Sequence, residues 1–210
     1  GWEKSGKTRL ALTAPEPVIY LDLDWGSEGV IEPMMENRQI LVYQADQPSK
    51  LGSPSELMDR FKVTWSNIQD RIDQALRLES GTLVIDTFTE IYDICRLAHF
   101  GKLAQVQPHQ YAVCYADLRE IFRLAHKSKM NVIMLHKLGQ NFHTGVAESK
   151  GWSEVAYSVQ GTIRTERVNG DQGPEFSARI IDCRPKPELM GRSLVKPCLD
   201  MEFILSLLQT

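Results

Sequence analysis

The chain has 210 residues, of which 42% are hydrophobic and 24% are charged, a composition typical of one globular domain over 1–210. Lys and Arg number 24 against 27 Asp and Glu, so the net charge of −3 excludes a global positive field that attracts nucleic acid and leaves room only for a local basic loop. No apolar run approaches the roughly 20 residues that cross a bilayer.

The first eight residues carry a phosphate-binding motif. They read Gly-Trp-Glu-Lys-Ser-Gly-Lys-Thr, which fits G-x-x-x-x-G-K-[ST]. In such a loop the backbone N–H groups cradle phosphates, the lysine reaches the β- and γ-phosphates, and the hydroxyl ligates Mg²⁺. We therefore predict ATP and Mg²⁺ as cofactors, with Lys7 catalytic and Thr8 a metal ligand. The predicted nucleotide-binding residues are Gly1, Lys4, Ser5, Gly6, Lys7, Thr8 and Arg9. Because a buried strand precedes such loops, we expect further chain ahead of Gly1.

Strands and helices alternate after this loop. Apolar runs predict strands over 18–24, 40–43, 83–86 and 131–136. Helical spacing of apolar residues predicts helices over 55–78, 91–103 and 110–129. The alternation predicts an α/β fold in which a mainly parallel sheet is flanked by helices.

The last third of the chain changes character. Residues 138–152 are polar and lack periodicity, so we predict a flexible loop. Strand patterns at 159–168 and 175–183 flank a turn rich in Gly, Asn and Asp, which predicts a hairpin over 156–184. A final helix is expected after Asp200, a residue that can cap it.

Three acids end predicted strands. Asp86 stands where P-loop enzymes hold Mg²⁺, and we predict it as a metal ligand. Asp22 and Asp24 alternate along one strand, so their carboxylates share a face near the carboxyl edge of the sheet. Thr87 follows Asp86 where AAA+ motors carry a catalytic glutamate, so the base must come from elsewhere. We predict Asp24 as the base that deprotonates water, with Asp22 as the alternative.

His136 ends the next strand, where P-loop ATPases keep a polar residue that senses the γ-phosphate, and we predict it as catalytic; a purely structural histidine is the alternative. Aromatic rings that stack on bases contribute about 1–3 kcal/mol per base in single-strand binders. Glu148 and Glu154 offset the basic residues of this region, so a loop without any DNA role is the alternative. The candidate DNA-binding residues are Lys137, Phe142, His143, Lys150 and Trp152.

The four cysteines are widely spaced and form no C-x-x-C pair; they are Cys95, Cys114, Cys183 and Cys198. This pattern predicts reduced, mostly buried thiols in a cytoplasmic protein, in preference to a zinc site or a disulfide framework.

Taken together, the P-loop and the strands ending at Asp24, Asp86 and His136 make the chain resemble RecA-fold ATPases. More specifically, it resembles the phage-encoded AAA-domain proteins that include the Sak-type single-strand annealing recombinases. The resemblance spans nearly the whole chain and implies a RecA-like core with the hairpin extending the sheet. It also implies ATP hydrolysis coupled to single-stranded DNA, a ring or filament of identical subunits, and the cytoplasm of a bacterial host.

By this resemblance, Asp24 takes the position of the catalytic glutamate of RecA and His136 that of its γ-phosphate-sensing glutamine. Residues 138–152 match its second DNA-binding loop. Aspartate is one methylene shorter than glutamate, which implies slow hydrolysis. Two other functions stay open: a P-loop kinase that phosphorylates a small acceptor, although no arginine-rich lid is evident, and a nucleotide-dependent assembly module with little turnover.

Overall fold

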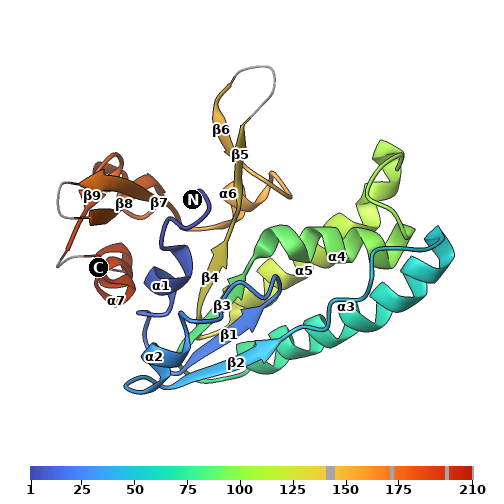
Figure 1. Ribbon diagram of the computed structural model, residues 1–210, viewed down its shortest axis with the longest axis horizontal. Helices are drawn as coiled ribbons and strands as arrows, with labels where there is room; N and C mark the ends of the chain where they lie inside the picture. The colour runs from blue at the N-terminus through green and yellow to red at the C-terminus, as the bar shows by residue number, and fades with distance from the viewer. Residues whose placement is uncertain (141–144, 171–172, 197–198, 210) are drawn as a thin grey trace.

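A four-stranded parallel sheet organises the chain, which the computed structural model describes over residues 1–140, 145–170, 173–196 and 199–209 (Figure 1). The strand order is β2-β1-β3-β4. The strands are β1 (Val18–Asp22), β2 (Ile40–Gln44), β3 (Thr82–Asp86) and β4 (Asn131–Leu135). Asp22 lies in register with Asp86, so the strand-end acids meet at one edge, as the sequence predicts.

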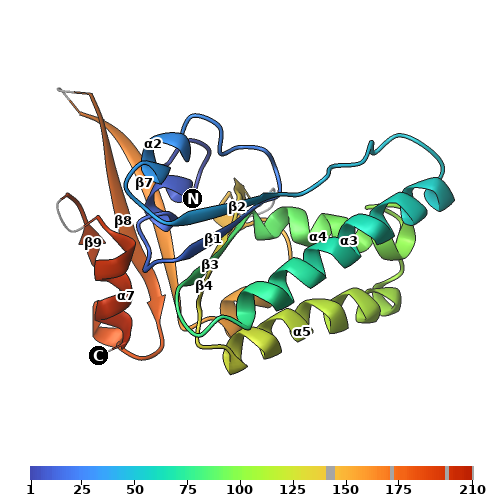
Figure 2. The ribbon, with the colours of Figure 1, turned by 90° about the horizontal axis from the view of Figure 1, so that it is seen from below.

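Helices cover both faces of this sheet. Successive side chains along each strand point to opposite faces, and both faces carry apolar residues that need to be buried. Leu21, Leu83 and Ile85 point toward the three long helices, whereas Tyr20 and Val84 point to the opposite face. Figure 2 shows the long helices gathered on one side of the sheet and the two ends of the chain on the other. The long helices are α3 (Pro54–Leu76), α4 (Phe88–Phe100) and α5 (Ala112–Lys127), and the opposite face carries α1 (Lys7–Ala11) and α2 (Glu32–Met35).

The helix boundaries follow local capping chemistry. Ser53 and Glu56 form a capping box at the start of α3, where each side chain accepts a hydrogen bond from the other residue's backbone N–H. Helix α4 begins directly after Thr87, three residues earlier than predicted, and ends at Gly101, which takes the left-handed conformation. A short 3₁₀ turn (Pro108–Tyr111) precedes α5.

The predicted C-terminal hairpin is present as β7 (Gly161–Gly170) and β8 (Gly173–Cys183). It pairs with β9 (Ser193–Leu194) in a separate three-stranded sheet, so it does not extend the parallel sheet. The reason is that the hairpin packs by its face: Ala178 of β8 joins one apolar cluster with Leu10 of α1 and Ile204 of α7 (Met201–Gln209). Two short helical turns lie nearby, α6 (Val155–Ser158) and η2 (Pro187–Leu189).

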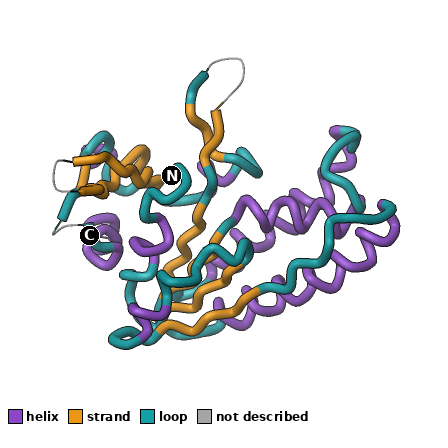
Figure 3. The backbone as a smooth tube through the Cα atoms, in the orientation of Figure 1, coloured by secondary structure: helices purple, strands orange, loops and turns teal. Residues whose placement is uncertain are grey.

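Two parts of the predicted loop over 138–152 are short strands. Strands β5 (Leu138–Gln140) and β6 (Ala147–Ser149) pair antiparallel and form a ribbon that continues from β4 (Figure 3). The pairing of these two strands satisfies backbone hydrogen-bonding groups of both, so a polar sequence without a strand pattern still forms a ribbon. Within the described part of the chain, no helix combines the length and hydropathy that a membrane span requires.

Candidate active site

The P-loop wraps around the side chain of its own lysine. Lys7 Nζ donates to the carbonyl oxygens of Gly1 at 3.3 Å and Trp2 at 2.8 Å. Gly6 has φ +83°, a left-handed conformation that glycine adopts without strain. Burial lowers the pKa of Lys7, while the carboxylates of Asp86 and Asp24 oppose this shift. The lysine ammonium is therefore within electrostatic reach of both predicted acids.

Thr8 and Asp86 meet as the sequence predicts. Thr8 Oγ1 donates to Asp86 Oδ2 at 2.6 Å, and the hydroxyl of Tyr20 donates to the same oxygen at 2.7 Å. Burial raises the pKa of Asp86, partly offset by these two hydrogen bonds. Nearby Asp22 accepts from Ser27 Oγ through Oδ2, and its buried Oδ1 has no partner among the described residues. Hydroxyl and carboxylate oxygens are the hard ligands that Mg²⁺ prefers, so this donor set fits that ion.

Asp24, the predicted base, is held by a lysine. Lys137 Nζ lies 3.0 Å from Asp24 Oδ2 and 2.8 Å from Glu90 Oε1. Burial opposes the charge on Lys137, but the two carboxylates outweigh it and raise the pKa of this lysine. Lys50 approaches Glu90 at 3.6 Å from the other side. These four residues, together with Trp25 and Gln47, line a pocket of about 380 Å³.

His136 lies behind the P-loop. Its backbone oxygen accepts a hydrogen bond from Gly1 N at 3.3 Å, which ties the end of β4 to the loop. Nδ1 lies 3.3 Å from the carbonyl oxygen of Lys150, the ring packs on Phe88 with centroids 5.5 Å apart, and the buried Nε2 has no partner among the described residues. Burial lowers the pKa of His136, which favours the neutral imidazole. Its sensing role stays a prediction.

The C-terminal hairpin braces the P-loop. Ser5 Oγ and Thr165 Oγ1 of β7 are 2.7 Å apart, and both hydroxyls are buried. A Cβ at Gly6 would lie 3.1 Å from the ring of Phe176 on β8. The Ser5 hydroxyl also donates to the carbonyl oxygen of Trp2 at 2.8 Å, so this side chain joins the P-loop to the hairpin. Lys4 and Arg9 are exposed, and their nucleotide contacts stay predictions.

The candidate DNA-binding residues separate into different environments. Trp152 is 4% exposed, and its ring stacks on Tyr115 of α5 at 5.8 Å between centroids. It is therefore a core residue in this structure and offers no face to a base, which corrects the predicted stacking role. Lys137 is engaged by Asp24 and Glu90, whereas Lys150 is exposed. Phe142 and His143 lie outside the described residues.

Sequence reasoning missed three contributors to this site. Glu90 follows the strand-end acid within Thr87-x-x-Glu90, and its backbone N–H donates to the Thr87 hydroxyl, a capping pattern that places an acid at the sheet edge. Tyr20 precedes Asp22 by two residues, and the alternation of strand side chains was the signal for their shared face. Thr165 carried no local signal, because its contact with Ser5 joins residues 160 positions apart.

Comparison with known proteins supports the architecture. No family model and no curated protein matches the chain. Among solved structures, the chain is similar to a crystal structure of the RadB recombinase, with a TM-score of 0.50 over 92% of this chain and 82% of that chain. The fold is RecA-like. At 15% sequence identity this likeness establishes the fold alone.

Proposed function

We propose that this chain is a RecA-like P-loop ATPase of DNA recombination that uses ATP and Mg²⁺. The observation that carries the proposal is the meeting of Lys7, Thr8 and Asp86 at the carboxyl edge of the parallel sheet, with Thr8 Oγ1 2.6 Å from Asp86 Oδ2. Ligands of open α/β sheets bind outside this edge. The recombination role rests on the structural likeness to the RadB recombinase.

Each residue has a distinct task in this proposal. Lys7 exchanges its bonds to loop carbonyls for the phosphates, and its ammonium charge stabilises the transferred group. Thr8 and Asp86 would hold Mg²⁺, which when bound offsets phosphate charge. Asp24 orients and deprotonates the attacking water, and His136 senses the γ-phosphate. Lys137, which also pairs with Glu90, holds the Asp24 carboxylate at the pocket wall.

The DNA substrate forms the more specific part of the proposal. We propose single-stranded DNA as the partner and a phage-encoded, Sak-type annealing recombinase as the family. The β5–β6 ribbon is the candidate contact, because it projects from the end of β4 and carries the exposed Lys150 (Figure 1). Its first strand, β5, begins two residues after His136, so DNA bound to the ribbon would be coupled to the end of β4, which contacts Gly1 of the P-loop.

A nucleotide-dependent assembly module with little turnover is the second candidate. The ion pair of 3.0 Å between Lys137 and Asp24 favours it, because a carboxylate held by an ammonium group is a poorer acceptor for the proton of water. In this case nucleotide binding changes subunit association and hydrolysis is negligible.

The first test measures Mg²⁺-dependent ATP hydrolysis with and without single-stranded DNA. We expect turnover that DNA stimulates several-fold and that Lys7→Ala abolishes, while Lys62→Ala, an exposed lysine on α3, serves as the unchanged control. Unchanged turnover in Lys7→Ala would refute the site. Turnover indifferent to DNA would remove the recombinase role, and ATP-driven assembly without turnover would favour the second candidate.

A further inference from the structure

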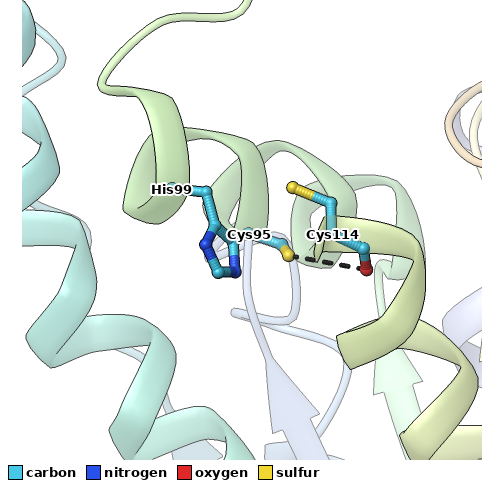
Figure 4. Close-up of side chains that lie close together, drawn as sticks. All are labelled: Cys95, His99 and Cys114. Atoms are coloured by element: carbon cyan, nitrogen blue, oxygen red, sulfur yellow. Dashed lines mark hydrogen bonds between the residues drawn. The ribbon is translucent and has the colours of Figure 1, made fainter. Parts of the chain in front are cut away.

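Helices α4 and α5 bring two cysteines and a histidine together (Figure 4). Cys95 and His99 are four residues apart on α4, so they share one helical face. Cys114 lies in the first turn of α5. One ligand atom from each side chain lies within 4.8 Å of the other two. Among the described residues, this is the one such group of metal-ligating side chains that the structure brings within reach of a single ion.

A fourth donor stands beside these three residues. Asp117 lies one turn after Cys114 on α5, and its Oδ2 is 2.8 Å from His99 Nε2. The same oxygen accepts a hydrogen bond from Trp65 Nε1 of α3 at 3.0 Å, which fixes the carboxylate. Asp117 lies outside the group of three ligand atoms that are all within 4.8 Å of one another, so its carboxylate has to move from its contact with His99 toward an ion held by those three. Both cysteines are 0% exposed, whereas the His99 and Asp117 side chains are each 31% exposed and provide a path from solvent.

We propose that Cys95, His99, Cys114 and Asp117 form a binding site for one zinc-like divalent ion. Two sulfurs, one imidazole and one carboxylate are the donors of tetrahedral zinc, and this mixture disfavours Mg²⁺ and Ca²⁺. With Zn–S near 2.3 Å and Zn–N near 2.0 Å, tetrahedral ligand atoms lie about 3.3–3.8 Å apart. The ligand atoms of Cys95, His99 and Cys114, which lie within 4.8 Å of one another, close onto an ion by side-chain movements of about 1 Å, and Asp117 joins them as the fourth ligand by a larger movement.

Charge and protons balance on binding. Each cysteine gives up its thiol proton to solvent, His99 binds through a neutral ring nitrogen, and the ion displaces the contact between that nitrogen and Asp117. Two thiolates and one carboxylate against a divalent cation leave a net charge of −1 at the site. Trp65 continues to donate to the carboxylate, as outer-shell partners of metal sites do.

The position of the site indicates a structural role. Thr87 and Glu90 at the beginning of α4 belong to the candidate active site, whereas Cys95 and His99 occupy the later turns of the same helix. A bound ion would join α4 to α5 and thereby stabilise the helical layer on which β3 packs. The metal site is thus independent of the proposed ATPase activity, and a test of one proposal does not decide the other.

Cobalt titration tests this site directly. The full chain, kept reduced and stripped with a chelator, is titrated with Co²⁺, followed by Zn²⁺. We expect one equivalent with a thiolate-to-cobalt charge-transfer band in the near ultraviolet and the visible bands of tetrahedral cobalt, both removed by Zn²⁺. Cobalt at Thr8 and Asp86 would have oxygen ligands and give no thiolate band, so the two sites are distinguishable.

Matched variants locate the ligands. Cys114→Ser and His99→Ala should lose the tetrahedral spectrum, while Cys183→Ser, which removes a buried cysteine of β8, should keep it. Zn²⁺ should raise the Tm of the wild type and leave the Tm of His99→Ala unchanged. Because the His99 side chain is partly exposed, His99→Ala should still fold, and it keeps the test valid if Cys114→Ser fails to fold. No thiolate band in the wild type, or the same band in His99→Ala and Cys114→Ser, would overturn the proposal and leave simple buried thiols.

Discussion

In the proposed mechanism, ATP turnover depends on the carboxylate of Asp24, which accepts the proton of the attacking water. Asp24→Asn keeps the size of the side chain and removes its basicity. We expect unchanged ATP affinity and hydrolysis reduced at least tenfold, or about 1.4 kcal/mol in the barrier. Steady-state turnover and nucleotide affinity measure the two effects separately. Asp46→Asn, at an exposed position, is the control, and normal hydrolysis by Asp24→Asn would reassign the base to Asp22 or another group.

His136 makes stability depend on pH. Burial lowers the pKa of this imidazole below its usual 6.5 in the folded chain, so the unfolded chain binds the proton more readily. Stability is therefore fully present at pH values above the unfolded pKa and decreases as the pH falls through it. We expect the wild type to lose more free energy of unfolding than His136→Asn between about pH 7.5 and pH 5.5. Urea denaturation of both proteins at each pH measures the difference, and parallel curves would contradict it.

At the scale of elements, the β5–β6 ribbon is anchored by the tryptophan that follows it. Trp152 packs on Tyr115 and Phe122 of α5, and Arg119 lies 5.9 Å from its ring centroid. The Lys150 backbone completes the attachment, because its N–H donates to the carbonyl oxygen of Lys137 at 2.8 Å. The ribbon is thus connected both to the helical layer and to the end of β4.

Trp152→Ala should destabilise the chain by about 3–5 kcal/mol, as expected for the removal of a large buried aromatic side chain. Chemical denaturation measures this loss. The matched control is Trp25→Ala, because that ring is 55% exposed and its removal should cost far less. A Trp152→Ala protein that keeps its stability and loses only affinity for single-stranded DNA would restore the stacking role that its burial argues against.

The hairpin and the P-loop form the other contact between distant elements. Ser5 and Thr165 join the loop to β7, and Phe176 of β8 closes over Gly6. The hairpin packs by its face on α1 and α7, and it therefore supports the phosphate-binding loop directly. It does not pair with β2 or β4, the two outer strands of the parallel sheet.

At the scale of the whole molecule, two tryptophans are exposed around the proposed nucleotide site. Trp2 of the P-loop is 43% exposed, and Trp25, which lines the pocket with Asp24, is 55% exposed. Aromatic side chains are enriched in protein interfaces. Their position is compatible with the ring or filament that the resemblance to RecA-fold ATPases implies, in which a neighbouring subunit would cover the nucleotide.

Assembly should therefore depend on ATP and on this aromatic surface. We expect the mass measured by light scattering to increase with ATP and Mg²⁺ for the wild type. Trp25→Ser should reduce this increase several-fold with nucleotide binding retained, whereas Val63→Ser, at another exposed apolar position on α3, should behave as the wild type. A monomer at all nucleotide concentrations would contradict the proposed oligomer.

Much of the fold follows from local patterns that can be recognised in the sequence. The P-loop motif, the apolar strands and the helical spacing of α3 each depend on neighbours within a few residues. The strand predicted over 18–24 ends two residues earlier, at Asp22, so Asp24 follows β1. Because the P-loop motif and the strand-end acid are both predicted to hold one Mg²⁺, Thr8 and Asp86 are expected to lie close together; their 2.6 Å hydrogen bond agrees with that, and their metal role stays a prediction.

Only the tertiary structure decided the contacts between residues far apart in the chain. The ion pairs of Lys137 with Asp24 and Glu90, the contact of Ser5 with Thr165 and the burial of Trp152 depend on how packed elements meet, which no local period encodes. The same holds for the Cys95, His99 and Cys114 cluster. Its spacing carries no metal-binding signature, and the three side chains converge because the packing of α4 against α5 brings two helical faces together.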